Sequence, residues 1–185
     1  MKKETLMVDM DDVITYGNFF NLIQEFLNKK IKLDDVKTYW LQDLIKDRKE
    51  EFWNWVKDKN FYDNSELMPN CYEVLEKLNM KYDLYIVTAY LWNETVDLSG
   101  KNLQNKYYFL KEKLPFIKPE QYIFTTNKLL CNFDIRIDDR LYNLEGAKKK
   151  IMFEAWHNRE YSDEELRKNN VIKVRDWKEI AEILL

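Results

Sequence analysis

Short apolar runs recur along the chain, and each is bounded by charged or turn-forming residues. Their length and composition are typical of strands buried on both faces of a sheet. Between them lie longer stretches in which apolar residues recur every three or four positions, the spacing of an amphipathic helix. The predicted strands cover Thr5–Val8, Leu84–Val87, Tyr122–Phe124, Ile135–Ile137, Ile151–Phe153 and Val171–Val174.

The helical stretches alternate with these strands. Alternation of this kind predicts an α/β fold, a Rossmann-like parallel sheet with helices on both faces. The predicted helices cover 16–28, Val36–Ile45, Glu50–Lys57, a segment after Pro69 that carries Val74, Leu75 and Leu78, then Asn102–Lys113 and Lys178–Leu184.

Composition excludes several classes of protein. A length of 185 residues with 45% apolar residues suits one domain, or one domain with a small insertion. The 30 Lys and Arg against 33 Asp and Glu leave no basic surface for a nucleic-acid polymer. No apolar stretch approaches the roughly 18–20 residues of a membrane span, and the start lacks a signal-peptide pattern. We therefore expect a cytoplasmic protein that binds no membrane, with Cys71 and Cys131 as reduced thiols.

Polar residues stand where several predicted strands end. Asp9, Thr88 and Asp138 each follow or end an apolar run, and Lys128 lies in the loop after another. The carboxyl ends of parallel strands share one edge of the sheet, which is where open α/β sheets bind ligands. The sequence therefore predicts that these residues, scattered over the chain, meet in one cleft.

This set of side chains suits phosphoryl transfer. Asp9 and Asp138 offer the oxygen ligands that Mg²⁺ prefers, and a carboxylate such as Asp9 can attack phosphorus. Lys128, the Thr88 hydroxyl and main-chain N–H groups can hold the charge of the transferring group. Asp11 can deliver and later accept a proton. With a single histidine, which we read as a loop residue, a histidine-based triad or metal site is not expected.

The order of these motifs resembles the haloacid dehalogenase superfamily of phosphotransferases. The first motif of that superfamily, D-x-D-x-[TV] after a strand, is Asp9-Met10-Asp11-Asp12-Val13 here. The other three motifs are represented by Thr88 in Ile86-Val87-Thr88-Ala89, by Lys128, and by Asp138-Asp139 in Ile137-Asp138-Asp139-Arg140.

Within that superfamily the chain is similar to the 5′(3′)-deoxyribonucleotidase family over nearly its whole length. The similarity rests on the Asp-Met-Asp start, the Ile-Asp-Asp-Arg motif, the aromatic-Asn-Arg loop at Phe153–Arg159 and Arg175-Asp176-Trp177. The resemblance implies a small helical cap, residues 15–68, inserted after the first strand, with residues 1–14 and 69–185 forming the core. The cap linkers are expected near Val13–Gly17 and Asn64–Pro69.

The resemblance also implies an activity: Mg²⁺-dependent removal of phosphate from nucleoside monophosphates through an aspartyl-phosphate. Asp9 would be the nucleophile and Asp11 the acid and base, and a homodimer would be plausible for the family. Asp9, the Asp11 carbonyl and Asp138 would bind the metal, with Asp139 hydrogen-bonded beside them. Thr88, the Ala89 N–H and Lys128 would hold phosphate.

Two positions depart from the family pattern. Asp12 stands where the best-known members have Gly, and it must point away, cap a helix or change the surroundings of the metal; we favour a cap or a surface charge. Tyr16-Gly17 stands where an aromatic contact to the base is expected, so the motif does not fix the base contact. A capping role for Asp9 and Asp11 at the following helix is a further, weaker alternative.

The substrate pocket is less well defined. Trp40 and Trp53 in the cap, and Tyr90 and Trp92 after Thr88, are candidates for stacking on a base, although aromatics at helical spacing usually form core. A sugar phosphate or another small phosphomonoester is an alternative substrate. A receiver-like signalling domain is a third hypothesis, but its motifs run in the opposite order.

Overall fold

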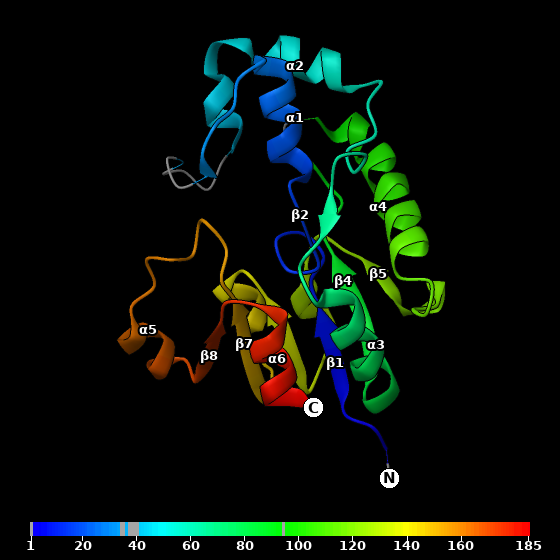
Figure 1. The fold of residues 1–185 in the computed structure, drawn as a ribbon, viewed down its shortest axis with the longest axis vertical. Helices are drawn as coiled ribbons and strands as arrows, with labels where there is room; N and C mark the ends of the chain where they lie inside the picture. Colours follow the sequence, from blue (N-terminus) through cyan, green and yellow to red (C-terminus); the bar gives the residue numbers. More distant parts are fainter. Residues whose placement is uncertain (1, 34–35, 37–40, 94) are drawn as a thin grey trace.

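The computed structural model describes residues 2–33, 36, 41–93 and 95–185. In that part of the chain a six-stranded parallel sheet has the strand order β5-β4-β1-β6-β7-β8 (Figure 1). All of the predicted strands are confirmed, and β1 lies centrally with β4 and β6 on its two sides. The strands are β1 (Thr5–Val8), β4 (Asp83–Thr88), β5 (Tyr122–Phe124), β6 (Ile135–Asp138), β7 (Lys149–Phe153) and β8 (Val171–Val174).

The two faces of the sheet are covered differently. Helices α3 and α6 pack on one face, and α4 lies beside β5, where Tyr107 and Tyr122 are in ring contact (Figure 1). The other face is covered by η6, α5 and the loop that carries Cys131 and Phe133. The expected helices on both faces are therefore present, but one face depends largely on loops. These elements are α3 (Cys71–Lys81), α4 (Ser99–Lys113), α5 (Asp163–Lys168) and α6 (Trp177–Leu184), with the 3-10 helices η3 (Val96–Leu98), η4 (Pro119–Gln121), η5 (Lys128–Leu130) and η6 (Leu141–Leu144).

Alternation along the strands explains why both faces are apolar. In β1, Leu6 and Val8 belong to the large core under the long helices, while Met7 belongs to a separate cluster on the other face. In β6, Ile135 and Ile137 face the large core. Because successive side chains of a strand point to opposite faces, Arg136 of β6 lies on the loop-covered face.

The segment predicted to form the cap carries α1 (Asn18–Leu27), η2 (Leu41–Arg48) and α2 (Lys49–Val56), which pack together at the top of Figure 1. Phe52 is fully buried between them, with ring centroids 5.5 Å from Phe19 and 5.3 Å from Phe26. Edge-to-face ring pairs of this kind add roughly 0.5–1.5 kcal/mol beyond their burial. The side chains of Phe19, Phe26 and Phe52 therefore form the hydrophobic core of this segment.

One predicted helix differs from the structure. The prediction for Val36–Ile45 falls partly on residues 37–40, outside the described residues, and the part from Leu41 is a 3-10 helix rather than an α-helix. Its backbone leaves helical geometry at Ile45, with φ −114°. Ile45 is also the one buried residue of this segment, so no continuous apolar stripe anchors an α-helix there.

The two linkers of this segment pair with each other. Strand β2 (Thr15–Tyr16) runs antiparallel to β3 (Glu66–Leu67), and the Thr15 hydroxyl donates to the Glu66 carbonyl at 2.7 Å. Gly17 follows with φ +86°, a conformation that favours glycine, and turns the chain into α1. The connection is thus a short ribbon, and the division at 15–68 stays a prediction.

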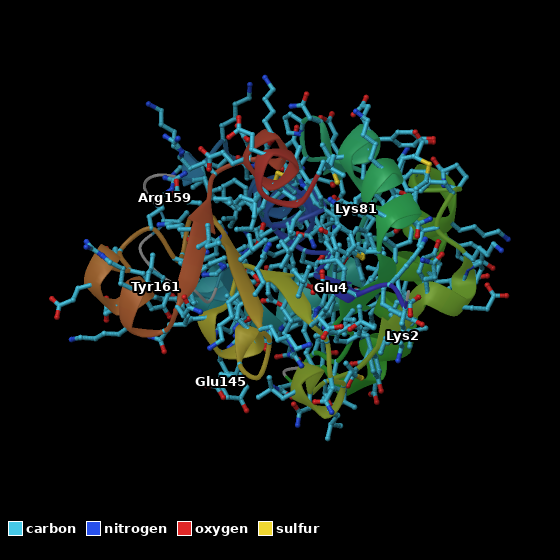
Figure 2. All side chains as sticks on the ribbon, turned by 90° about the horizontal axis from the view of Figure 1, so that it is seen from below. Lys2, Glu4, Lys81, Glu145, Arg159 and Tyr161 are labelled. Atoms are coloured by element: carbon cyan, nitrogen blue, oxygen red, sulfur yellow. The ribbon has the colours of Figure 1, made fainter. Side chains whose placement is uncertain are left out.

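The opposite end of the molecule carries charged side chains. Figure 2 shows Lys2 and Glu4 beside the start of β1 and Lys81 near them, with Arg159 and Tyr161 at the left of the view.

No helix within the described ranges is long and apolar enough to cross a membrane.

Candidate functional site

The residues at the strand ends come together as predicted. Asp9 follows β1, Asp138 ends the neighbouring β6, and Lys128 lies at the start of η5. The Lys128 ammonium stands between the two carboxylates, 2.6 Å from Asp9 Oδ2 and 2.7 Å from Asp138 Oδ2. All three side chains are buried. A single cation therefore bridges two acids that lie far apart in the sequence.

Burial dominates the electrostatics of this group. It raises the pKa of Asp9 and of Asp138 to about 6, against the opposing effect of Lys128. Burial alone would lower the pKa of Lys128, but Asp138 and Asp9 together hold that pKa above its ordinary value. Lys128 therefore stays protonated, and the two carboxylates share its charge.

Asp11 is held by donors from both sides of the cleft. Its Oδ1 accepts from the Tyr62 hydroxyl at 2.6 Å and from Asn18 Nδ2 at 2.7 Å, and its Oδ2 accepts from Lys106. Helix α1 begins at Asn18 with Gly17 at its N-cap, so neither Asp9 nor Asp11 caps it. The capping alternative is wrong.

Lys106 is a site residue that the sequence reasoning missed. It is 2% exposed, and its ammonium also donates to the Thr88 hydroxyl at 2.7 Å. Lys106 lies on α4 on the same face as the buried residues Asn102, Phe109 and Leu110. A lysine at the spacing of an apolar stripe is the signal that could have found it.

The two acids of the last motif have different surroundings. Asp138 is fully buried, and its Oδ1 accepts from the Arg140 N–H and from Asn143 Nδ2, each at 2.9 Å. Asp139 Oδ2 lies 2.6 Å from His157 Nε2, while its other oxygen has no partner among the described residues. His157, expected to be an ordinary loop residue, is thus part of the site.

Asp12 does not point away from the cleft. Its φ of +58° is left-handed, which explains a Gly preference at this position and which Asp tolerates better than most residues. An oxygen of its carboxylate, a carboxylate oxygen of Asp139 and an imidazole nitrogen of His157 all lie within 4.8 Å of one another. Burial, then Asp139 and Asp11, raise the pKa of Asp12 well above its ordinary value. Of the three alternatives, a change in the surroundings of the predicted metal site fits, and the favoured interpretation of a cap or surface charge is wrong.

The two C-terminal segments that resemble the family fasten the site. Asn158 is buried and donates to the carbonyls of Asp139 at 2.8 Å and Phe153 at 2.7 Å. The Trp177 indole donates to the Val13 carbonyl at 2.8 Å. These contacts hold the loops that carry the acidic residues, which is a structural role.

The acidic residues can hold a divalent cation. Asp9, Asp138 and Asp139 each offer an oxygen, all within 4.8 Å of one another. Carboxylate oxygens are the ligands that Mg²⁺ prefers. Burial raises the pKa of Asp9 and Asp138 because it disfavours their charged forms, and a bound cation would stabilise those charged forms.

A cleft of about 380 Å³ is lined by these residues and by residues of the predicted cap. Its lining includes Ala89, Lys106 and Lys128, which we call the core wall, and Trp53 and Trp92, whose ring centroids lie 5.3 Å apart. Tyr90 is not among the lining residues; its carbonyl accepts from Asn102. Trp40 lies outside the described residues. The aromatic rings of the lining, which we call the aromatic wall, are Phe19, Trp53, Phe61, Tyr62 and Trp92.

Comparison with solved structures supports the fold. The structure superimposes on a haloacid dehalogenase-like hydrolase from Burkholderia xenovorans with a TM-score of 0.58 at 11% identity, covering 99% of this chain and 97% of that one. It superimposes on a HAD family hydrolase from Deinococcus radiodurans with a TM-score of 0.53 at 12% identity, covering 98% and 97%. The α/β fold is therefore of the haloacid dehalogenase type.

Comparison with known sequences identifies the family. The 5′(3′)-deoxyribonucleotidase of Clostridium acetobutylicum is 30% identical over 97% of this chain and 93% of its own length. That of Bacillus subtilis is 27% identical over 99% of both chains. The family model described as "5′ nucleotidase, deoxy (Pyrimidine), cytosolic type C protein" matches residues 3–185. The chain belongs to this family of nucleotidases, which are phosphoric monoester hydrolases.

Proposed function

We propose that this protein hydrolyses deoxyribonucleoside monophosphates through an aspartyl-phosphate, with Mg²⁺ as cofactor. The observation that carries the proposal is the contrast between the two walls of the cleft. One wall presents Asp9, Lys106 and Lys128, and the other presents aromatic rings that pack against one another. A phosphate fits the first wall and a base fits the second.

The phosphate is held by the cations of the core. Lys128 and Lys106 supply positive charge on the two sides of Asp9 and Asp11, and the Thr88 hydroxyl and Ala89 N–H supply donors. In the resting structure these lysines are paired with the catalytic carboxylates. The phosphate oxygens would take up donor capacity of the same lysines and so lie against Asp9.

The reaction then has two steps. The Asp9 carboxylate forms a bond to phosphorus, the bond from phosphorus to the sugar oxygen breaks, and Asp11 gives that oxygen its proton. In the second step Asp11 takes a proton from water, which attacks the phosphoaspartate and releases inorganic phosphate. Tyr62 and Asn18 hold the Asp11 carboxylate in place during both steps.

The metal would be held by Asp9, the Asp11 carbonyl and the acidic pair. Asp138 already binds Lys128, Asn143 and the Arg140 N–H, whereas Asp139 keeps one oxygen without a partner among the described residues. Asp9 is paired with Lys128 as closely as Asp138 is, so a bound cation would take the place of Lys128 at both. We therefore propose Asp139 as a further ligand beside Asp9 and Asp138. When bound, Mg²⁺ supplies positive charge beside the phosphate.

The nucleoside part of the substrate is assigned to the aromatic wall. Both relatives named above carry the name 5′(3′)-deoxyribonucleotidase, and stacking on an aromatic ring is worth roughly 1–3 kcal/mol per base. We propose that residues 15–68 act as a cap that carries all of these rings except Trp92, with the β2–β3 ribbon as its connection to the core.

A phosphatase screen tests the proposal. Purified protein is assayed with Mg²⁺, and separately with a chelator, against 5′- and 3′-deoxynucleotides, ribonucleotides and a set of sugar phosphates. We expect the highest kcat/KM for a deoxynucleotide and loss of activity with the chelator. A sugar phosphate that is hydrolysed faster than every nucleotide would reject the substrate assignment while leaving the chemistry intact.

A thermal shift measurement tests the metal assignment. Mg²⁺ binds the folded state and should raise the melting temperature of the wild type by mass action. We expect Asp138→Asn and Asp139→Asn each to reduce this rise. A variant that keeps the full rise would remove its residue from the proposed ligand set.

A further inference from the structure

Two irregular loops carry much of the site on the loop-covered face of the sheet. The first, residues 125–134, joins β5 to β6 and contains Lys128 in the short η5. The second, residues 139–148, joins β6 to β7 and contains Asn143 in the short η6. Such loops leave main-chain carbonyls without the partners that a long helix would give them, and buried carbonyls need donors. Something else must hold the loops in place.

Arg136 of β6 supplies those donors. It is 2% exposed, although a buried strand between two isoleucines is an unusual place for a guanidinium. One of its terminal nitrogens donates to the Asn143 carbonyl at 2.8 Å and to the Lys128 carbonyl at 3.4 Å. The other donates to the Cys131 carbonyl. One side chain therefore ties both loops to the same strand.

The residues held by Arg136 converge again at the active site. Lys128 binds Asp9 and Asp138 through its ammonium, and Asn143 binds Asp138 through its amide. Arg136 and Asp138 lie two positions apart on the same strand and so on the same face. Arg136 is thus connected to Asp138 through both loops, by way of Lys128 in the first and Asn143 in the second.

We propose that Arg136 is a positioning residue for the phosphatase site. It fixes the Lys128 loop against the Asn143 loop, so that Lys128 stands between Asp9 and Asp138. Arg136 contacts the site only through main-chain carbonyls of these loops and does not line the cleft. Lysine cannot replace it fully, because a single ammonium cannot reproduce the planar fork that spans several acceptors.

The test compares Arg136→Met and Arg136→Lys with Leu78→Ala, which removes a fully buried side chain of α3 on the other face. Kinetics are measured below the melting temperature of every variant, together with hydrogen exchange of the amides in both loops. For Arg136→Met we expect kcat to fall on the order of 10²-fold, the cost of a small displacement of catalytic groups. KM should change less than kcat, and both loops should exchange faster.

Arg136→Lys keeps the charge, and we expect it to fold, to lose about tenfold in kcat and to exchange faster in the same two loops. Leu78→Ala should melt at a lower temperature but keep the kcat and loop exchange of the wild type. Wild-type kcat in Arg136→Lys, or an equal loss in Leu78→Ala, would overturn the proposal. The kinetic part rests on the proposed function. If the wild type hydrolyses no phosphomonoester, that function fails, and loop exchange alone decides the role of Arg136.

Discussion

The two walls of the cleft are built on opposite principles. The core wall consists of charged side chains that are buried and paired with one another, such as Lys128 between Asp9 and Asp138. The opposite wall consists of aromatic rings that belong to a hydrophobic cluster, in which Phe61 and Tyr62 are buried and Trp53 and Trp92 are partly buried. The first wall is built from the ends of parallel strands together with α4 and η5. The second is held by ring packing between the predicted cap and Trp92 of the loop after β4. From this difference we expect the two walls to have separate roles. Residues of the core wall should determine kcat, and residues of the aromatic wall should determine which substrate is bound.

Removal of the proposed nucleophile should have the largest effect. Asp9→Asn should lower kcat by on the order of 10³-fold or more, because an amide is a poor nucleophile toward phosphorus. Phosphate release from a deoxynucleotide and a melting curve measure the two consequences. Asp134→Asn is the matched control: Asp134 binds Thr5 and Lys148 at the amino end of the sheet, so its loss should cost stability and leave kcat unchanged. Asp9→Asn activity within tenfold of the wild type would exclude the covalent route.

Loss of the buried cation on α4 should come next. Lys106→Met removes a donor shared by Asp11 and Thr88, and we expect kcat/KM to fall by about 10²-fold, the usual cost of one such electrostatic contact. Lys113→Met, on the exposed side of the same helix, should retain wild-type kinetics. Equal kinetics for the two variants would mean that Lys106 only fills space in the core.

The sequence predicted the part of this wall that follows from strand order. Asp9, Thr88 and Asp138 end apolar strands, so the rule that parallel strands share an edge was enough to bring them together. Lys106 was missed because a lysine within a helix is normally solvated, and only its spacing with Phe109 and Leu110 distinguishes it. Side-chain contacts that depend on tertiary packing had no such signal.

Asp12 and Tyr62 illustrate that limit. The left-handed backbone at Asp12, which decides where its side chain lies, follows from the path of the loop after β1 and not from residue type. Tyr62 reaches Asp11 because the segment after α2 folds back toward β1, a long-range arrangement between residues 51 positions apart. Local patterns in a sequence do not record such an approach, whereas they do record which strands are buried.

Tyr62 sharpens the comparison, because it comes from the predicted cap but contacts a catalytic carboxylate. Tyr62→Phe removes one donor to Asp11 and leaves Asn18 and Lys106. We expect kcat to fall by about tenfold with little change in KM, since a hydrogen bond to a charged group is worth roughly 1.5 kcal/mol. Steady-state kinetics with a deoxynucleotide measure it. Tyr16→Phe removes the Tyr16 hydroxyl that donates to Glu66 in the ribbon, and it should leave kcat unchanged. A similar loss of kcat in both variants would mean that the effect arises from the ribbon and not from Asp11.

The smallest effect is expected at the aromatic wall, and it should be visible only as selectivity. Trp53 lines the cleft, whereas Trp55 packs on Phe26 and Phe52 within the predicted cap. If Trp53 stacks on the base, Trp53→Ala should raise KM for a deoxynucleotide by about fivefold, the lower end of the stacking range, because Trp92 remains. Its turnover of para-nitrophenyl phosphate, which has no base, should stay near that of the wild type. Trp55→Ala should lower the melting temperature without changing the ratio of the two substrates. An equal loss of kcat/KM with both substrates in Trp53→Ala would assign Trp53 to the core of the cap. The aromatic wall would then not determine which substrate is held, and the proposed difference between the two walls would be wrong.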